Sequence, residues 1–230
     1  MKQATTLSRR NFLVSAAAAA AVGSALPFKV SAASALESAA RPSNPAIPGY
    51  RERPVPGGRL PSQWSNVLAR HEIQNREAIG AAYADPWRQL LGHFRGRQLD
   101  VRLLADINDA INRLSFVPDP ANYGISDRWA TPREFLAKGG DCEDFAIAKF
   151  LVLRELGYDQ LNKKLVVCRH DIRKEAHAVV TCTLHNKIYV LDNLNVKLTE
   201  GWPTNLYTAF YGIDEGTWVI YSKVLPSFVS

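Results

Sequence analysis

The sequence predicts an α+β fold in which helices come first along the chain and an antiparallel sheet follows. Apolar residues recur at three- and four-residue steps before Gly157, whereas short segments rich in Val, Ile, Thr and Tyr follow it. Patterns that segregate along the chain in this way are typical of α+β proteins rather than of wound α/β proteins. The composition, with 47% hydrophobic and 22% charged residues among 230, excludes a wholly disordered chain.

Residues 1–35 have the three parts of an export signal. Arg9 and Arg10 precede an apolar run from Phe12 to Leu26, which at about 15 residues is too short to span a bilayer as a helix. A cleavage site of the A-x-A type follows at 33–35. Because S-R-R-N-F-L resembles the twin-arginine signal, we expect a periplasmic protein that is exported folded and has no stable membrane span after cleavage.

The basic charge of the sequence is concentrated in this leader. The formal net charge is +6, but residues 1–35 carry four basic residues and no acidic one, which leaves +2 for the rest. The remaining basic residues form no long run, so we expect no nucleic-acid binding. Six prolines and three glycines between 36 and 61 predict a linker without a regular helix or sheet ladder.

Residues 62–230 are expected to form one domain that begins with helices. Apolar spacing predicts three of them, at 62–84, 86–94 and 99–116. Another begins at Thr131, with Pro at N1 and Glu at N3, and ends at Gly139–Gly140. The last runs from Asp141 or Cys142 to Glu155 or Leu156, and Gly157 ends it.

The second half of the domain is expected to form the sheet. Strands are predicted at 164–168, 177–184, 187–191 and 217–224, with His185–Asn186 as a tight turn. Cys168 and Cys182 fall on neighbouring strands, where they are either a disulfide suited to the periplasm or two buried small apolar residues. With three cysteines and no C-x-x-C pair, the sequence excludes a disulfide scaffold and a zinc site of that spacing.

Cys142 is the candidate nucleophile. It begins a helix, where the dipole and the free N–H groups favour a thiolate and can bind an oxyanion. A nucleophilic cysteine needs a base and an orienting group, and His177 and Asp192, on successive strands, can supply them. Antiparallel strands can hold these two side by side, facing the Cys142 helix. Each residue alone is as readily structural, but their order predicts a Cys-His-Asp triad.

Four segments resemble the motifs of one family, the bacterial transglutaminase-like cysteine proteinases of the LapG-like type. They are W-A-T-P-R-E-F-L at 129–136, G-D-C-E-D-F-A-I-A-K at 140–149, E-A-H-A-V-V at 175–180 and V-L-D-N-L at 190–194. The resemblance, which covers roughly residues 98–221, implies a papain-like, transglutaminase-like core. It makes Cys142 the nucleophile, His177 the base and Asp192 the group that orients the imidazole. It also implies a protein substrate in the cell envelope and a membrane-bound regulatory partner.

Acidic residues flank the candidate nucleophile on both sides. Asp141, Glu143 and Asp144 should raise the pKa of the thiol, since nearby negative charge opposes a thiolate. They are either helix-start acids that complement the dipole or ligands for a hard cation. The resemblance points to Ca²⁺ bound by these three residues. Ala178 departs from the family pattern, which commonly has Met here, so a different substrate groove is expected.

These observations together predict an exported cysteine endopeptidase, with calcium dependence as an open question. The same triad also serves acyl transfer to an amine and cleavage of a peptidoglycan cross-peptide, so both alternatives remain. A non-catalytic, calcium-dependent interaction module is a third. The backbone N–H of Cys142 should form part of the oxyanion hole, and the second donor is expected within 123–129.

Overall fold

The computed structural model describes residues 47–56, 59–78, 85–158 and 160–224, all in the unit Pro42–Ser230. The expected signal peptide at 1–35 and the linker up to residue 46 lie outside the described residues. The helices are α2 (Ser62–Glu77), α3 (Pro86–Phe94), α4 (Val101–Asn112), α5 (Asp119–Tyr123), α6 (Pro132–Lys138) and α7 (Cys142–Glu155). The strands are β1 (Tyr50–Pro54), β2 (Asn162–His170), β3 (Glu175–Leu184), β4 (Lys187–Leu191), β5 (Thr199–Glu200), β6 (Tyr207–Ile213) and β7 (Trp218–Lys223).

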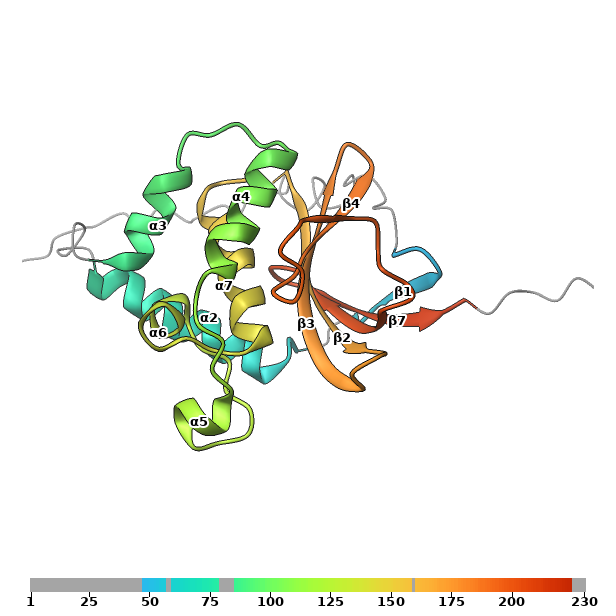
Figure 1. Ribbon diagram of the computed structural model, residues 1–230, viewed down its shortest axis with the longest axis horizontal. Helices are drawn as coiled ribbons and strands as arrows, with labels where there is room; N and C mark the ends of the chain where they lie inside the picture. Colours follow the sequence, from blue (N-terminus) through green and yellow to red (C-terminus); the bar gives the residue numbers. More distant parts are fainter. Residues whose placement is uncertain (1–46, 57–58, 79–84, 159, 225–230) are drawn as a thin grey trace, which may run out of the picture. The chain divides into compact units, whose positions relative to one another are not determined.

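The strands form one antiparallel sheet in the order β1-β7-β6-β2-β3-β4-β5. The helices lie together on one side of this sheet, with α7 next to β3 (Figure 1). Helix α7 packs against β2 and β3 on one side and against α4 and α6 on the other. This arrangement confirms the expected α+β class and places the start of α7 beside the sheet.

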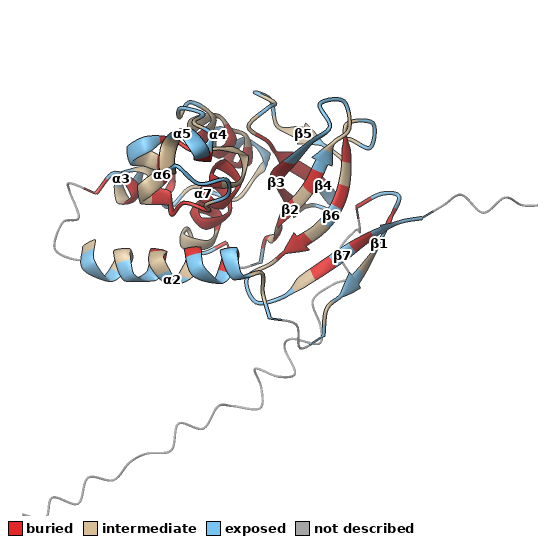
Figure 2. Ribbon diagram, turned by 90° about the horizontal axis from the view of Figure 1, so that it is seen from below, coloured by how far each residue is buried: buried red, intermediate tan, exposed pale blue. Residues whose placement is uncertain are grey.

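Two apolar clusters cover the two faces of the sheet. The larger surrounds α7, whose residues Asp144–Leu153 are all buried, and includes Ala178, Val180 and Cys182 of β3 (Figure 2). The smaller contains Val179 of β3 together with residues of β2, β4, β6 and β7. Because side chains alternate along a strand, the even-numbered residues of β3 face α7 and the odd-numbered ones face the smaller cluster.

The turn before α7 explains why two glycines and an aspartate precede Cys142. Thr131 caps α6 through a capping box with Glu134, as the sequence predicts, and Gly139 ends the helix with a φ of 76°. A Cβ at Gly139 would meet the carbonyl of Ser115, and one at Gly140 would collide with the Asp144 carboxylate. Only glycines therefore let the chain turn tightly enough to place Cys142 at the start of α7.

The prediction that prolines prevent a sheet ladder between 36 and 61 is wrong for Tyr50–Pro54. These residues form β1, an edge strand paired with β7 from Tyr50↔Lys223 to Pro54↔Val219. Pro54 is tolerated because it ends an edge strand, and Tyr50 is held by burial and by a hydrogen bond from the Ala209 N–H to its hydroxyl. The strands β5 and β6 and the helix α5 are further elements that the sequence analysis did not anticipate.

The two strand cysteines are separate and free. The register pairs Cys168 with His177 and Cys182 with Lys163, and the two thiols belong to the clusters on opposite faces of the sheet. Of the two alternatives, the structure therefore favours two buried small residues over a disulfide.

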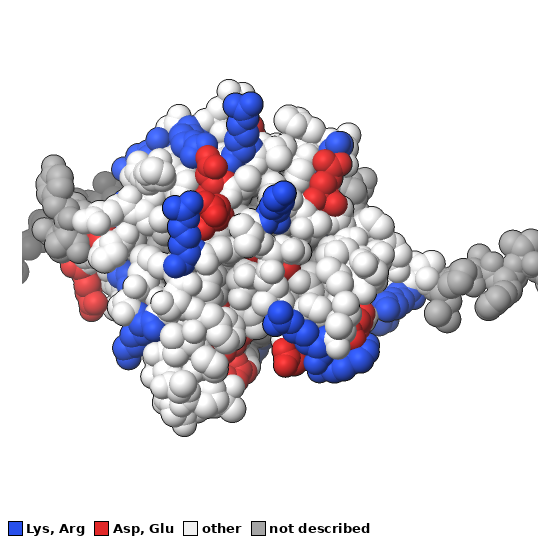
Figure 3. Space-filling model, in the orientation of Figure 1, with Lys and Arg blue, Asp and Glu red and all other residues white. Residues whose placement is uncertain are grey.

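Charged side chains are mixed on the surface. On the face shown in Figure 3, basic and acidic side chains lie interspersed rather than in a field of one sign. In the part of the chain that the structure describes, no helix combines the length and apolar character needed to cross a membrane.

Candidate active site

Cys142 is the first residue of α7 and is partly buried. Burial raises the pKa of its thiol, and the charge and hydrogen bond of Glu143, with the charge of Asp141, raise it further. A hydrogen bond from the backbone N–H of Ala178 to the sulfur acts in the opposite direction. The nucleophile candidate therefore lies directly against β3, next to the residue that follows His177.

His177 and Asp192 form the buried pair that the sequence analysis expects. His177 Nε2 and Asp192 Oδ1 lie 2.9 Å apart, and both side chains are almost fully buried. The Leu194 N–H donates to the same oxygen at 2.9 Å, and the Tyr207 hydroxyl donates to Oδ2. Burial alone would raise the pKa of Asp192, but the hydrogen bond and charge of His177, with the hydrogen bonds from Tyr207 and Leu194, outweigh it and lower this pKa.

The expectation that His177 and Asp192 face the Cys142 helix is wrong. Both side chains lie with Tyr207 on the face opposite α7, because Ala178 and Leu191, their neighbours in sequence, face the α7 cluster. Cys142 meets the edge of β3 through the Ala178 N–H. Cys142 and His177 therefore lie at the same edge of β3 but on opposite faces of the sheet.

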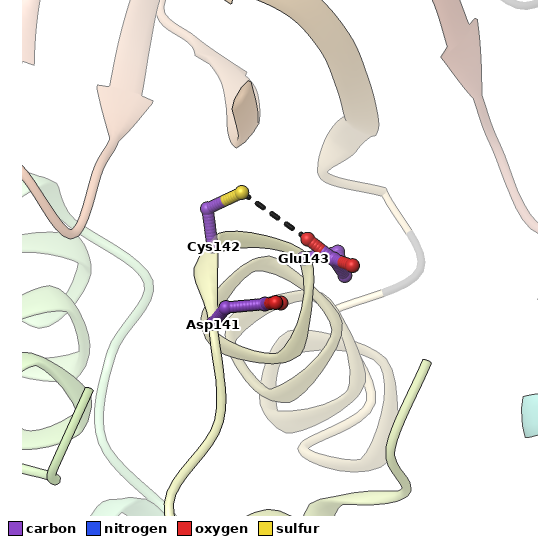
Figure 4. A group of neighbouring side chains, drawn as sticks. All are labelled: Asp141, Cys142 and Glu143. Atoms are coloured by element: carbon purple, nitrogen blue, oxygen red, sulfur yellow. Dashed lines mark hydrogen bonds between the residues drawn. The ribbon is translucent and has the colours of Figure 1, made fainter. Parts of the chain in front are cut away.

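The Cys142 thiol donates a hydrogen bond to a carboxylate rather than to the imidazole. Its Sγ lies 3.1 Å from Glu143 Oε2, and Figure 4 shows Asp141, Cys142 and Glu143 together at the start of α7. Among the described residues, no hydrogen bond joins Cys142 to His177. In this arrangement the thiol is held in its protonated form.

Five carboxylates gather around the start of α7. Asp141 lies close to Glu143 and Cys142 in one group and to Asp119 and Asp144 in a second, while a third joins Glu143 to Asp119 and Asp127. Burial is the largest cause that raises the pKa values of Asp141 and Asp144 to about 8, and it also raises those of Asp119 and Glu143. Repulsion between the neighbouring carboxylates raises these pKa values further.

The carboxylates of this cluster differ in their hydrogen-bonding partners. Both oxygens of Asp144 accept backbone hydrogen bonds, from the Ala130 N–H at 2.6 Å and from the Asp141 N–H at 3.3 Å, so it also serves as a helix-start acid. Oδ1 of Asp141 and Oδ1 of Asp119 are buried without a hydrogen-bond partner. Unpartnered buried carboxylate oxygens are the donors that a hard cation takes, so the chemistry of this cluster fits Ca²⁺.

The family follows from a comparison of the sequence with known families. The family model described as bacterial transglutaminase-like cysteine proteinase BTLCP matches residues 90–219, which is more than half of the chain. The chain belongs to this family. None of the curated proteins compared with the chain matches it.

Solved structures of LapG from Legionella pneumophila share the fold of this cysteine proteinase. The calcium-bound form is 23% identical with a TM-score of 0.51, covering 71% of this chain and 91% of that chain. The EGTA-treated form is also 23% identical at a TM-score of 0.51, covering 73% and 90%. A further LapG structure is 24% identical at 0.50, covering 70% and 90%. These likenesses confirm the transglutaminase-like fold.

Several residues of the proteinase site were not anticipated from its sequence. Tyr207 lies 15 residues beyond Asp192, on a strand that the sequence analysis missed. Asp119 begins α5 and Asp127 lies in the segment after it, and both reach the acidic cluster only through tertiary folding. The Arg128 N–H donates a hydrogen bond to Asp119. Segment 123–129, expected to hold an oxyanion donor, borders this cluster.

A buried lysine lies on α7 two turns beyond Cys142. Lys149 is 1% exposed, and its Nζ lies 5.9 Å from the centre of the Phe145 ring. Burial lowers the pKa of Lys149 to about 7, while the negative charge of Asp192 acts against that shift. The carboxylate that pairs with His177 therefore also acts electrostatically on a buried lysine.

Proposed function

We propose that this cysteine proteinase is an exported endopeptidase that uses Cys142, His177 and Asp192 as a catalytic triad. The observation that carries the proposal is the contact of the Cys142 sulfur with the residue directly after a histidine whose Nε2 is bound to a buried aspartate. With Nε2 engaged by Asp192, Nδ1 is the ring nitrogen left for the thiol proton.

The reaction follows from these roles. His177 Nδ1 accepts the thiol proton, and the Cys142 sulfur attacks the carbonyl carbon of a peptide bond. The negative oxygen that forms is stabilised by the Cys142 N–H, since this group has no helical partner at the start of α7. The imidazolium donates its proton to the leaving amine as the C–N bond breaks. Water, deprotonated by His177, then hydrolyses the thioester and regenerates the thiol.

The hydrogen bond between Cys142 and Glu143 must break before this reaction begins. We propose that the acidic cluster binds Ca²⁺ through Asp119, Asp127, Asp141 and Glu143, with Asp144 beside them. The unpartnered oxygens of Asp119 and Asp141 support this, as does the calcium-bound form of the LapG relative. Held by these residues, a cation would neutralise carboxylate charge and so favour the thiolate of the adjacent cysteine.

Cellular context is part of the proposal. The leader sequence supports export to the periplasm by the twin-arginine route. We propose a cell-envelope protein as substrate and a membrane-bound regulator as partner, both by likeness to the family. Comparing new protein N-termini in envelope fractions from wild-type and Cys142→Ala cells tests the substrate, and identical sets of N-termini would contradict it.

Alkylation of Cys142 tests the triad. With calcium present, we expect rapid labelling by iodoacetamide near neutral pH in the wild type and its loss in His177→Ala, because the base promotes the thiolate. Labelling no faster than that of a free thiol would exclude the catalytic roles and leave the interaction module as the better account. A labelled amine that becomes joined to an acceptor protein would indicate acyl transfer instead of hydrolysis.

Chelation tests the cation site separately. We expect EGTA to lower the melting temperature and the labelling rate, and added calcium to restore both. Asp119→Asn should weaken calcium binding in a calorimetric titration by about tenfold, the loss of roughly one charged ligand interaction. The control Asp109→Asn removes an exposed acid of α4 that pairs with Arg113 and should bind calcium normally. Equal affinities for both variants would rule out Asp119 as a ligand.

A further inference from the structure

One stretch of β3 has an open edge beside the candidate nucleophile. Every residue of β2 pairs with β3, from His170↔Glu175 to Asn162↔Thr183. Strand β4, in contrast, pairs with β3 only from Val180↔Leu191 onward. Residues 175–179 therefore have no strand on the β4 side within the described chain. The unpaired segment belongs to an inner strand of the seven-stranded sheet rather than to one of its two edge strands.

The hairpin fixes which backbone groups point into this gap. Residues His185 and Asn186 both have positive φ and form a two-residue turn of the I′ kind, so Leu184 and Lys187 exchange both of their hydrogen bonds. Because the hydrogen-bonding direction alternates along a strand, the other even-numbered residues of β3, which include Ala178 and Ala176, also direct their N–H and C=O groups toward the β4 side. The N–H of Ala178 reaching the Cys142 sulfur is an independent sign of the same direction.

The hydrogen bonds of Asp192 keep this part of the β3 edge unpaired. After Leu191 the chain leaves β3, because Asp192 turns to His177 and accepts the Leu194 N–H, while Asn112 Nδ2 donates to the Asp192 carbonyl at 2.7 Å. Asn193 consequently does not reach its pairing position opposite Ala178. Ala176 is exposed, and its small side chain leaves the backbone accessible.

We propose that the substrate binds as an extended polypeptide segment that completes the sheet in this gap, pairing its backbone with the N–H and C=O of Ala176. The inference rests on the proposed function and names how its substrate is recognised. Ala176 lies two residues from Ala178, about 7 Å along the strand, so the paired substrate residue lies about one dipeptide step from the Cys142 sulfur. Recognition through backbone groups selects unfolded or extended protein segments rather than a particular side chain.

Two alkylating probes of different size test this site. Iodoacetamide needs only the thiol, whereas acetyl-Ala-Ala-Ala chloromethyl ketone also presents a peptide backbone. Ala176→Pro removes the edge N–H but no hydrogen bond to β2, and a strand edge tolerates proline. We expect this variant to lower the labelling rate of the peptide reagent about tenfold, while the iodoacetamide rate and the melting temperature stay unchanged.

The control and the second measurement keep the outcomes distinct. Glu175→Ala alters the neighbouring exposed side chain and should leave the ratio of the two rates as in the wild type. In the wild type, N-methylation of one amide of the peptide reagent should slow labelling, and in Ala176→Pro the same reagent should show no further loss. An unchanged ratio in Ala176→Pro, or no sensitivity to N-methylation at any amide, overturns the docking site. Slow iodoacetamide labelling of the wild type in the presence of calcium would instead overturn the proposed function.

Discussion

Asp192 is the residue around which the site is organised. Its two oxygens receive three hydrogen bonds, so neither carboxylate oxygen is free to rotate away from His177. The backbone donor and the phenol come from different parts of the chain, and together they fix the carboxylate that binds the imidazole. The sequence identifies His177 and Asp192 from strand order, but it contains no local signal for Tyr207.

Removing the Tyr207 hydroxyl should impair the base without removing it. Tyr207→Phe is expected to slow iodoacetamide labelling of Cys142 about tenfold near neutral pH, because a hydrogen bond to a charged group contributes about 1.5–3 kcal/mol. Tyr158→Phe is the matched control, since it deletes a tyrosine hydrogen bond to the Arg97 carbonyl in the helical half. Equal labelling rates in the two variants would show that Tyr207 has no positioning role.

Lys149 should make stability depend on pH in a defined window. Its pKa is lowered to about 7 in the folded protein, against about 10.4 for an ordinary lysine, so between these values the unfolded chain binds a proton that the folded protein does not. Unfolding free energy from this group therefore rises with pH. In urea titrations at pH 7, 8 and 9, the wild type should gain stability relative to Lys149→Met. A difference that stays constant over this range contradicts the shift.

At the scale of elements, local chemistry predicts helix starts better than tertiary clusters. Thr131 and Gly139 act within a few residues of themselves, so their roles are visible in the sequence and are confirmed by the structure. Asp119 of α5 is brought to α7 by packing, and no spacing rule connects residues 119 and 141. Strand β6 was missed because its mixture of buried and exposed residues follows no simple alternation.

The far end of α7 is anchored by a partly buried acid. Glu155 accepts hydrogen bonds from Trp87 Nε1 at 3.1 Å and pairs with His71, which joins α7 to α2 and α3. Burial would raise the pKa of Glu155, but the hydrogen bonds and charge of His71, with Trp87 and Asn75, lower it. This link holds the helix whose opposite end carries Cys142.

Glu155→Gln should therefore destabilise the fold in a pH-dependent way. A carboxylate with a lowered pKa stabilises the folded state above its ordinary pKa near 4.3, and the contribution disappears as the pH falls through the folded value. We expect a loss of about 1–3 kcal/mol at pH 7 that shrinks toward pH 3.5, measured by urea unfolding. Glu72→Gln removes an exposed acid that pairs with Arg154 and should cost little. Equal losses at both pH values would contradict the assignment.

At the scale of the whole molecule, the first strand of the sheet in sequence order pairs with the last. Strand β1 covers the outer edge of β7 and buries Tyr50, with Ile47 buried just before it. An uncovered β7 would present free backbone groups to other chains, a known route to association. The short N-terminal strand therefore contributes to both stability and solubility.

Two truncations separate this strand from the residues before it. A chain that begins at residue 45 should unfold like the full chain without its leader, whereas one that begins at residue 56 should lose about 3 kcal/mol from burial of Ile47 and Tyr50. Urea unfolding measures the loss, and size-exclusion chromatography at rising concentration measures association through β7. If both chains behave alike, β1 makes no contribution to the sheet.

The pairing of β1 with β7 also sets an order in time. Strand β1 cannot pair until β7 has been synthesised, because Tyr50 pairs with Lys223, which lies far along the chain. All the residues between these two strands must therefore leave the ribosome before Tyr50–Pro54 can pair. For a protein exported in the folded state, as proposed, pairing of β1 then comes only after every other strand of the sheet has been made.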